Sequence, residues 1–442
     1  MEFLIYLLRG VLGLTFILGL AYALSSARNR VNWRLVGMGI LLQVILAIFI
    51  LKGDDMGRYV APLGWPKAFF SWISSFFVLI LNFTTEGAKF LFGSLALSPG
   101  QEGSLGHFFA FQVLPTIIFF SSLMSVLYHL GIMQRVVQAM AWLMARLMGT
   151  SGAESLSVTA NIFVGQTEAP LMIRPYLKGL TRSELLAVMT GGMATIAGGV
   201  MAAYIQMLGD SFAQAHQITL EAARLQFAEH LLGASVMAAP AALVLSKLLI
   251  PEIGEPETRG VVRAQVEKVS QNTIDAAARG AADGLKLAAN VGGMLIAFIA
   301  LIAMINYMLG WGGGLFGLHL SLEKLFGWTL SPVAWIIGVP WSDAIHFGSL
   351  LGTKIVVNEF VGYLKLADLI KAGIMQQRSV IMATYALCGF ANFSSIAIQI
   401  GGIGPLVPHR MSEIASLGLR AVMAGTLANM MTATIAGVLT AF

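Results

Sequence analysis

The sequence contains few charged residues and a single cysteine. Only 11% of its 442 residues are Asp, Glu, Lys or Arg, whereas 57% are hydrophobic, and the mean hydropathy is +0.79. Soluble globular domains carry about 25% charged residues, so this composition excludes an ordinary soluble protein. The lone cysteine, Cys388, excludes an intrachain disulfide. We therefore expect the chain to lie in a lipid bilayer.

The sequence also lacks two patterns that would indicate other classes of protein. Its apolar runs are continuous and rich in Leu, Ala, Ile and Met, whereas a membrane β-barrel needs short alternating strands. The net charge of +5 comes from scattered Lys and Arg residues, so no basic face predicts a nucleic-acid partner. The predicted fold class is an all-α polytopic membrane protein.

The apolar runs predict eight spans, because roughly 20 residues cross a bilayer as a helix. They are Phe3–Leu24, Arg34–Leu51, Phe108–Leu130, Leu185–Met207, His230–Ile250, Leu287–Leu309, Ser379–Ile400 and Leu417–Ala441. Two further apolar segments, Phe69–Phe92 and Val136–Met148, are interrupted by polar residues and are expected to be interfacial or tilted helices. The polar stretch from Glu252 to Asp283 predicts an extramembrane connection between two halves of the chain.

The first apolar run is expected to stay in the mature protein. A signal peptide carries basic residues before its apolar core, whereas here Arg28, Arg30 and Arg34 follow the core with no acidic residue among them. This charge order predicts that the N-terminus lies on the outer side of the membrane, opposite the cytoplasm. We expect a multi-pass protein of a bacterial inner membrane.

Two segments are apolar on both sides of a polar centre that can break a helix. The first, from Thr150 to Leu177, contains Gln166, Thr167 and Glu168, and the second, from Ser331 to Leu364, contains Asn358 and Glu359. Non-helical backbone at membrane depth is stable only where protein or a water-filled cavity surrounds it. Both segments are therefore predicted to be re-entrant hairpins.

The two halves of the chain follow the same order, a hairpin and then an interrupted helix. The interrupted helices contain Gly192-Met193-Ala194-Thr195-Ile196 and Gly389-Phe390-Ala391-Asn392-Phe393. Broken hydrophobic segments in matching positions of two halves are typical of a transporter whose substrate binds between repeats. We therefore predict a substrate site at the junction of these four elements.

Glu168 and Glu359 are the candidate binding residues with the clearest signal. A carboxylate at bilayer depth costs about 2.5–3.5 kcal/mol even on translocon-insertion scales, so each must be used or stabilised. Neighbouring Gln166, Thr167 and Asn358 supply neutral donors and acceptors that suit a polar, uncharged ligand. A purely structural alternative is that both carboxylates cap broken helices near water.

The glycine-rich run from Gly191 to Gly199 would expose backbone carbonyls, because glycine weakens a helix. Free carbonyls with the Thr195 hydroxyl and the Asn161 amide oxygen form a plausible Na⁺ site. Close packing of helices through small residues is the structural alternative.

A family resemblance rests on three motifs in order. The run Gly352-Thr353-Lys354-Ile355-Val356-Val357-Asn358-Glu359-Phe360-Val361-Gly362-Tyr363 resembles the signature of concentrative nucleoside transporters. Gly165-Gln166-Thr167-Glu168 and Gly389-Phe390-Ala391-Asn392-Phe393-Ser394-Ser395 are similar to the other two site motifs of that family. One departure is Gly362, where alanine is expected. The resemblance implies a homotrimer of protomers with eight membrane helices and two re-entrant hairpins in inverted repeats.

The resemblance also assigns residues to three groups of ligands. It implies nucleobase contacts from Gln166, Thr167, Glu168 and Val200, ribose contacts from Glu359, Phe390, Asn392 and Ser395, and sodium ligands from Asn161, Val164, Thr195 and Ile196. The implied function is a symporter that imports uridine and related nucleosides with sodium as the coupling ion, with no other cofactor and no enzymatic activity. Proton coupling remains an alternative, because an intramembrane glutamate can bind and release H⁺.

Two alternatives come from other classes of protein. Gly149-Thr150-Ser151-Gly152 resembles the GxSG of rhomboid-type proteases, but no histidine in the spans is convincingly placed to activate Ser151. A passive channel would carry substrate that sodium cannot drive uphill. The expected division of the chain is a scaffold over residues 1–149, a first hairpin repeat over 150–250, a polar connection and scaffold helix over 251–327, and a second hairpin repeat over 328–442.

Overall fold

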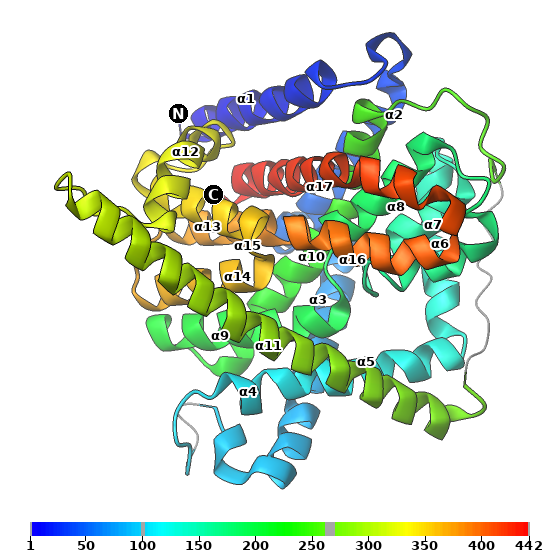
Figure 1. Ribbon diagram of the computed structural model, residues 1–442. Coiled ribbons are helices and arrows are strands. Elements are labelled where there is room, and N and C mark those ends of the chain that lie inside the picture. Colours follow the sequence, from blue (N-terminus) through cyan, green and yellow to red (C-terminus); the bar gives the residue numbers. More distant parts are fainter. Residues whose placement is uncertain (1, 99–101, 261–269, 441–442) are drawn as a thin grey trace.

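Helices form every regular element in residues 2–98, 102–260 and 270–440, which the computed structural model describes (Figure 1). The N-terminal part consists of α1 (Glu2–Ala23), the 3₁₀ helix η1 (Arg28–Arg30), α2 (Trp33–Tyr59), α3 (Ala61–Phe92), η2 (Gly93–Ala96) and α4 (Phe109–Gln112). No strand occurs in these residues, so the predicted all-α fold class is confirmed.

The rest of the chain repeats one order of elements twice. The first set is α5 (Leu114–His129), α6 (Ile132–Met148), a hairpin of α7 (Gly152–Ala160) and η3 (Ala169–Tyr176), a broken pair α8 (Arg182–Ala194) and α9 (Gly198–His216), and α10 (Leu220–Leu249). The second set is α11 (Thr273–Gly314), α12 (Leu322–Ile336), a hairpin of α13 (Trp341–Val356) and α14 (Glu359–Lys371), a broken pair α15 (Gln377–Leu387) and α16 (Phe393–Ile403), η4 (Gly404–Leu406), η5 (Pro408–Arg410) and α17 (Met411–Leu439). We call these sets the first and second repeat.

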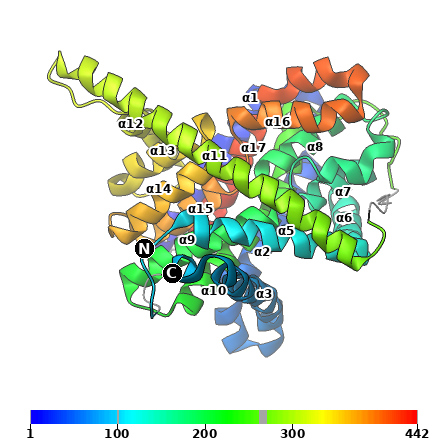
Figure 2. The ribbon, with the colours of Figure 1, turned by 60° about the horizontal axis from the view of Figure 1, so that its bottom comes forward.

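The two repeats meet along α5 and α11, the first helix of each. These helices are in contact and run in opposite directions, with the 42-residue α11 crossing the whole molecule diagonally (Figures 1 and 2). The opposite directions are those of inverted repeats.

Among the described residues, eight elements are long and apolar enough to cross a membrane. They agree in number with the prediction but differ at two places. Segment Phe69–Phe92, expected to be interfacial or tilted, belongs to the long apolar element Ala61–Ala96. Segment Ser379–Ile400 is not among the eight, because the chain breaks between α15 and α16, at the interruption predicted around Gly389-Phe390-Ala391-Asn392-Phe393.

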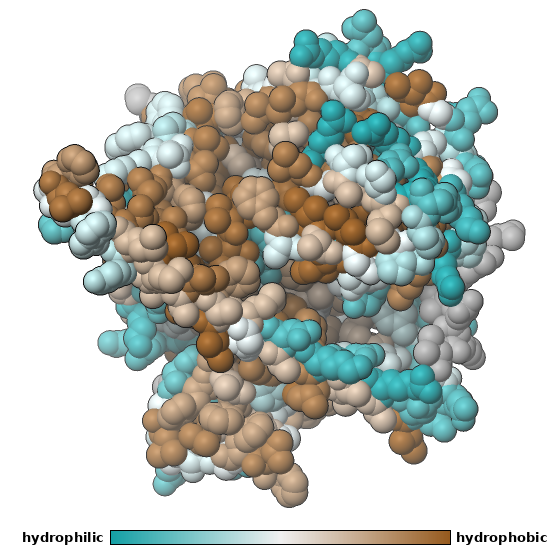
Figure 3. Space-filling view, viewed as in Figure 1, coloured by the Kyte–Doolittle hydropathy of each residue, from teal (hydrophilic) through white to brown (hydrophobic). Residues whose placement is uncertain are grey.

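Burial separates an inner group of helices from an outer group. Helices α8, α9, α10 and most of α17 are buried, whereas α1, α2, α3 and α11 expose most of their apolar surface. Hydrophobic residues cover the centre and left of the face in Figure 3, and hydrophilic residues gather along its upper right. Such broad apolar exposure is unusual for a soluble protein and fits a surface solvated by lipid.

Local sequence explains where the short helices begin. In the first repeat, helices α7 and α8 each start with a capping box. Ser151 pairs with Glu154 at α7, and Thr181 pairs with Glu184 at α8. In the second repeat, Asn358 caps α14 and Asn392 caps α16 through their side-chain oxygens. These caps satisfy N–H groups that have no partner inside the helix.

The hairpin boundaries required one correction. The second hairpin begins at Trp341 rather than at Ser331, because residues 331–336 complete α12 and the chain turns at Gly338, whose φ is +112°. The predicted connection from Glu252 to Asp283 ends inside α11, and residues 261–269 of it lie outside the described residues. The last predicted span likewise ends at Ala441, just beyond the described part of α17.

Candidate functional site

The two hairpin tips and the two helix breaks surround one cavity. Its volume is about 1230 Å³. All eight residues predicted to contact a nucleoside line it: Gln166, Thr167, Glu168, Val200, Glu359, Phe390, Asn392 and Ser395. These residues come from both repeats, so the cavity lies between the two halves of the chain, as the order of elements predicts.

Glu359 is the most enclosed carboxylate of the cavity. Only 5% of the residue is exposed. The Tyr204 hydroxyl of α9 donates a hydrogen bond to its Oε1 at 3.1 Å, and the Asn392 amide donates to its Oε2 at 2.9 Å. Each carboxylate oxygen therefore has one protein donor and retains further acceptor capacity for a ligand.

Asn392 is itself held in one orientation. Its Oδ1 accepts hydrogen bonds from the backbone N–H of Ser395 at 2.9 Å and from the Ser394 hydroxyl at 2.7 Å. The amide oxygen therefore caps the N-terminus of α16, and the amide nitrogen must face Glu359. The helix cap and the carboxylate contact depend on each other, which makes this side of the cavity rigid.

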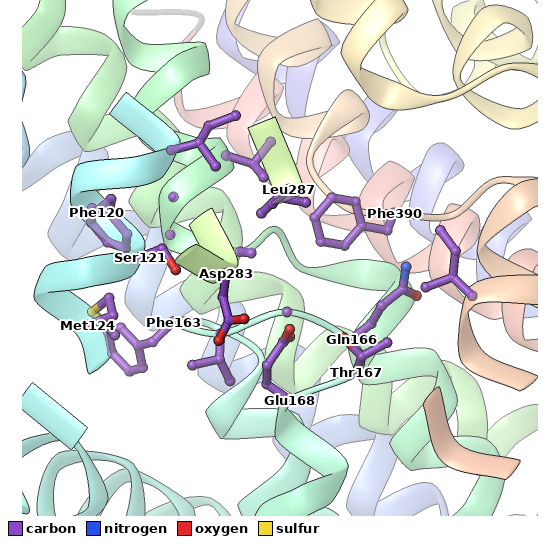
Figure 4. Close-up of a pocket in the computed structure, with 18 of the residues that line it drawn as sticks. Phe120, Ser121, Met124, Phe163, Gln166, Thr167, Glu168, Asp283, Leu287 and Phe390 are labelled. Atoms are coloured by element: carbon purple, nitrogen blue, oxygen red, sulfur yellow. The ribbon is translucent and has the colours of Figure 1, made fainter. Parts of the chain in front are cut away.

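Glu168, at the first hairpin tip, is in a different environment. It is exposed to the cavity, and no described side chain or backbone group forms a hydrogen bond with its carboxylate. Figure 4 shows Glu168 and Asp283 of α11 pointing into the same space, with Phe390 on the opposite side. Among the described residues, Glu168 is therefore a free acceptor that a ligand can reach.

Gln166 belongs to a chain of amides that fixes its orientation. Gln399 donates from Nε2 to the Met189 carbonyl at 2.8 Å and to Gln166 Oε1 at 3.1 Å. A carbonyl only accepts, so the nitrogen of Gln399 must point toward Met189 and Gln166. The Gln166 nitrogen then lies on the other side, where it donates to the Ser395 hydroxyl at 3.1 Å.

The four predicted sodium ligands lie beside the cavity in two adjacent loops. Val164 lines the cavity, and Asn161, Thr195 and Ile196 are buried. The Asn161 Oδ1 has no hydrogen-bond partner in the described part of the chain, although its amide nitrogen donates to Ser157. The Thr195 hydroxyl donates to the Gly191 carbonyl at 2.8 Å, which leaves its oxygen lone pairs available. A buried acceptor without a donor is the environment that a bound cation would satisfy.

Ser151 and Lys354 both bond to other groups of the protein rather than to the cavity. The Ser151 hydroxyl caps α7 and donates to Glu184 at 2.5 Å, so it is part of a helix cap rather than a nucleophile. Lys354 neither lines the cavity nor forms an ion pair with Glu359 within the described chain, because its ammonium bonds to carbonyls behind the site. Gly362 lies inside a continuous α14, where an alanine methyl group would come 3.0 Å from Leu387.

Sequence reasoning missed Tyr204, Gln399 and Asp283. Tyr204 lies four residues after Val200 on α9, and Gln399 lies four residues after Ser395 on α16. Residues four apart share a helix face, so a search one turn beyond each predicted contact would have found both. Asp283 comes from α11, which the sequence offers no local reason to place here.

Family models match most of the chain. Residues 12–95 match the model for the N-terminus of Na⁺ dependent nucleoside transporters, and residues 230–437 match the model for their C-terminus. Residues 110–211, which include the first hairpin, match a model described as nucleoside recognition.

Two of the similar proteins share more than two fifths of the aligned residues with this chain. YutK, an uncharacterized transporter of Bacillus subtilis, is 44% identical over 430 residues, which cover 97% of this chain and 98% of YutK. Mouse sodium/nucleoside cotransporter 1 is 41% identical over 97% of this chain, which spans 63% of the mouse protein.

Solved structures of one protein, CNTnw, have the same fold. CNTnw in an inward-facing substrate-bound state gives a TM-score of 0.86 at 41% identity, covering 99% of this chain and 98% of CNTnw. A CNTnw variant in an outward-facing state gives a TM-score of 0.84 at 41% identity, over 98% of this chain and 97% of that one. The similarity extends over nearly the whole chain and includes both hairpins.

Proposed function

The chain belongs to the Na⁺-dependent nucleoside transporter family, and from this premise we propose that it is a symporter that imports uridine and related nucleosides, driven by a sodium gradient, across a bacterial inner membrane. The observation that carries the proposal is the single cavity lined by both hairpin tips and both helix breaks. Binding between repeats gives a transporter a site that either side of the membrane can reach in turn.

The chemistry of the cavity favours a neutral ligand rich in hydroxyl groups. Among the described residues, its wall carries the carboxylates Glu168, Asp283 and Glu359 against one guanidinium, Arg174. Carboxylates accept hydrogen bonds from hydroxyls well, whereas they repel the phosphates of a nucleotide. We propose that Gln166, Thr167, Glu168 and Val200 contact the base, and that Glu359, Phe390, Asn392 and Ser395 contact the ribose.

Sodium is proposed to bind beside the first hairpin tip. The ligands would be the side-chain oxygens of Asn161 and Thr195 and the carbonyls of Val164 and Ile196. The unpartnered Asn161 Oδ1 supports this assignment. So does the non-helical backbone at Val164 and Ile196, because carbonyls outside helices are free to bind a cation.

The proposed division of the chain into a transport unit and a scaffold follows the repeats. Residues 150–250 and 328–442 would carry the substrate as a transport unit, and residues 1–149 and 251–327 would form a scaffold. We also propose a homotrimer, to which the exposed apolar face of α11 could contribute. The mass of the detergent-solubilised protein, corrected for bound detergent, would be three times that of the chain.

Uptake of uridine into proteoliposomes tests the function directly. An inward sodium gradient should drive uridine above its external concentration, and an inward proton gradient without sodium should not. Uptake driven by protons alone would support the proton-coupled alternative, whereas flux that only equilibrates uridine would indicate a passive channel.

The sodium site has its own test. Asn161→Ala and Thr195→Ala each remove one proposed ligand oxygen, so both should raise the sodium concentration that gives half-maximal uridine uptake. Thr434→Ala is a matched control, because the Thr434 hydroxyl is also buried and donates one turn back, to Met430, in α17. Unchanged sodium dependence in both Asn161→Ala and Thr195→Ala would remove the case for this ion site.

A further inference from the structure

A completely buried lysine lies behind the second hairpin, outside the cavity. Lys354 of α13 has no exposed surface. Its ammonium donates to the Ala386 carbonyl at 2.9 Å, the Cys388 carbonyl at 3.3 Å and the Asn429 Oδ1 of α17 at 2.7 Å. An ammonium has three N–H donors and no acceptor, so these three acceptors match its protonated form.

The position of this ammonium is the C-terminal end of a broken helix. Helix α15 ends at Leu387, and the chain leaves it through Cys388 and Gly389, whose φ of +111° is open to glycine. The last carbonyls of a helix have no intrahelical partner and carry partial negative charge. A cation is therefore the natural partner for them, and Lys354 supplies it.

The first repeat has the same feature without a lysine. Helix α8 ends at Ala194, and the chain leaves it through Thr195 and Ile196. In the described part of the chain no Lys or Arg side chain forms a hydrogen bond with these three residues. This is where the proposed sodium site lies, so the two repeats differ in the cation that their broken helices meet.

The two breaks also touch each other. The Asn429 Nδ2 donates to the Ala194 carbonyl at 2.7 Å, which obliges its Oδ1 to face Lys354. Gly389 packs directly on the same carbonyl: a Cβ at Gly389 would lie 2.6 Å from both the carbon and the oxygen of Ala194. One amide thus connects the ammonium of the second repeat to the backbone beside the sodium site of the first.

We propose that Lys354 is a fixed cation, which occupies at the end of α15 the place that sodium occupies at the end of α8. Together with Asn429, Lys354 is a positioning residue that fixes the end of α15 relative to the end of α8. Because its ammonium fills one of the two cation positions, only the other position needs an exchangeable ion. The inference rests on the proposed sodium site.

Replacing Lys354 by glutamine tests whether its charge matters. Glutamine leaves the Ala386 and Cys388 carbonyls without a cation, and a second sodium ion can take the vacated place at high concentration. Measured by uridine titration at a series of sodium concentrations, with choline as the balancing cation, the Hill coefficient for sodium should rise from about one toward two. Half-maximal binding should need about tenfold more sodium, because the charge-assisted hydrogen bonds of the ammonium are lost.

Lys247→Gln is the matched control. Lys247 is also a buried lysine, but it pairs with Glu154 at 2.7 Å and Glu252 at 3.0 Å at the base of the first hairpin, away from both breaks. A merely structural loss should lower thermal stability in either variant and leave the sodium Hill coefficient unchanged. Folded Lys354→Gln with wild-type steepness would overturn the proposal.

A second variant decides the question if Lys354→Gln does not fold. Asn429→Leu keeps the charge of Lys354 but removes both the link to Ala194 and one of the three acceptors of the ammonium, so the sodium requirement should rise with unchanged steepness. Wild-type sodium dependence in folded Asn429→Leu would contradict the link between the breaks. Failure of the proposed function has a different signature, since uridine binding by the wild type would then not depend on sodium at all.

Discussion

The tips of the two hairpins present their carboxylates in opposite ways. Glu359 is 95% covered and already holds hydrogen bonds from Tyr204 and Asn392, whereas Glu168 faces the cavity with no partner in the described chain. The sequence places both in similar settings, each at a polar centre between apolar segments. The structure separates them into a preorganised acceptor and an open one.

This difference suits the two parts of a nucleoside. Ribose is common to all nucleosides, so a rigid acceptor with its desolvation already offset by protein donors serves every substrate. The base varies, and an open acceptor can take a donor from a base edge or from water. We therefore expect changes at the second tip to lower affinity for all nucleosides, and changes at the first tip to alter the choice among them.

The largest effect is expected from Glu359→Gln. The amide cannot accept from both Tyr204 and Asn392, and it loses the charge that would bind a ribose hydroxyl. Bonds to charged groups are worth roughly 1.5–3 kcal/mol each, so losing the equivalent of two should weaken uridine binding at least about 100-fold. Isothermal titration with uridine and its 2′- and 3′-deoxy analogues gives the measurement.

The deoxy analogues test whether Glu359 contacts the ribose. Loss of the hydroxyl that faces Glu359 should lower the binding affinity much less in Glu359→Gln than in the wild type. The reason is that the free-energy effects of changing two groups in contact are not additive. Glu184→Gln is a control, since Glu184 is a buried carboxylate that binds Ser151 and Thr181 away from the cavity. Additive losses for both analogues would place Glu359 away from the ribose.

Glu168→Gln should have a smaller effect, about tenfold on uridine affinity, because one charge-assisted bond to the ligand becomes a neutral one. No described protein group bonds to Glu168, so the thermal stability of the ligand-free protein should not fall. Titration calorimetry and a thermal unfolding assay measure the two quantities. A clear loss of stability without ligand would mean that Glu168 supports the hairpin, contrary to the comparison of the tips.

Tyr204→Phe should weaken uridine binding by about three- to tenfold. It removes one donor to Glu359 and leaves the ring, which packs on Phe360 and Tyr363, in place. The loss should be equal for uridine, cytidine and adenosine, since Tyr204 donates to Glu359, the proposed ribose acceptor. Unequal losses would show that the rigidity of the second tip also influences base choice.

The sequence predicted the elements better than their internal contacts. Glu168 and Glu359 stood out because a carboxylate in an apolar segment is costly, and the hairpins stood out because polar centres break apolar runs. Lys354 belongs to the same motif as Glu359, yet its partners include the Ala386 carbonyl and the Asn429 side chain, which only the folded chain brings near. Hydropathy predicted a span over Ser379–Ile400, and the interruption expected at Gly389-Phe390-Ala391-Asn392-Phe393 lies where the turn at Gly389 and the Asn392 cap separate α15 from α16.

The smallest expected effect on affinity, and the most specific, comes from Gln399→Met. Methionine keeps the shape of Gln399 but cannot donate to the Gln166 oxygen, so the Gln166 amide is free to turn over. Ser395 does not prevent this, because a hydroxyl both donates and accepts. Uracil offers an acceptor O4 and a donor N3–H on one edge, whereas cytosine offers a donor N4–H₂ and an acceptor N3. A fixed amide therefore distinguishes the two bases, and a free one does not.

We expect Gln399→Met to change uridine affinity by less than about threefold, the worth of a weak neutral hydrogen bond, while the ratio of uridine to cytidine affinity moves toward one. Gln166→Ala should shift this ratio more than it shifts sodium dependence, and adding Gln399→Met to it should change the ratio no further. An additional change in the double variant would mean that Gln399 acts on the base by a route other than Gln166.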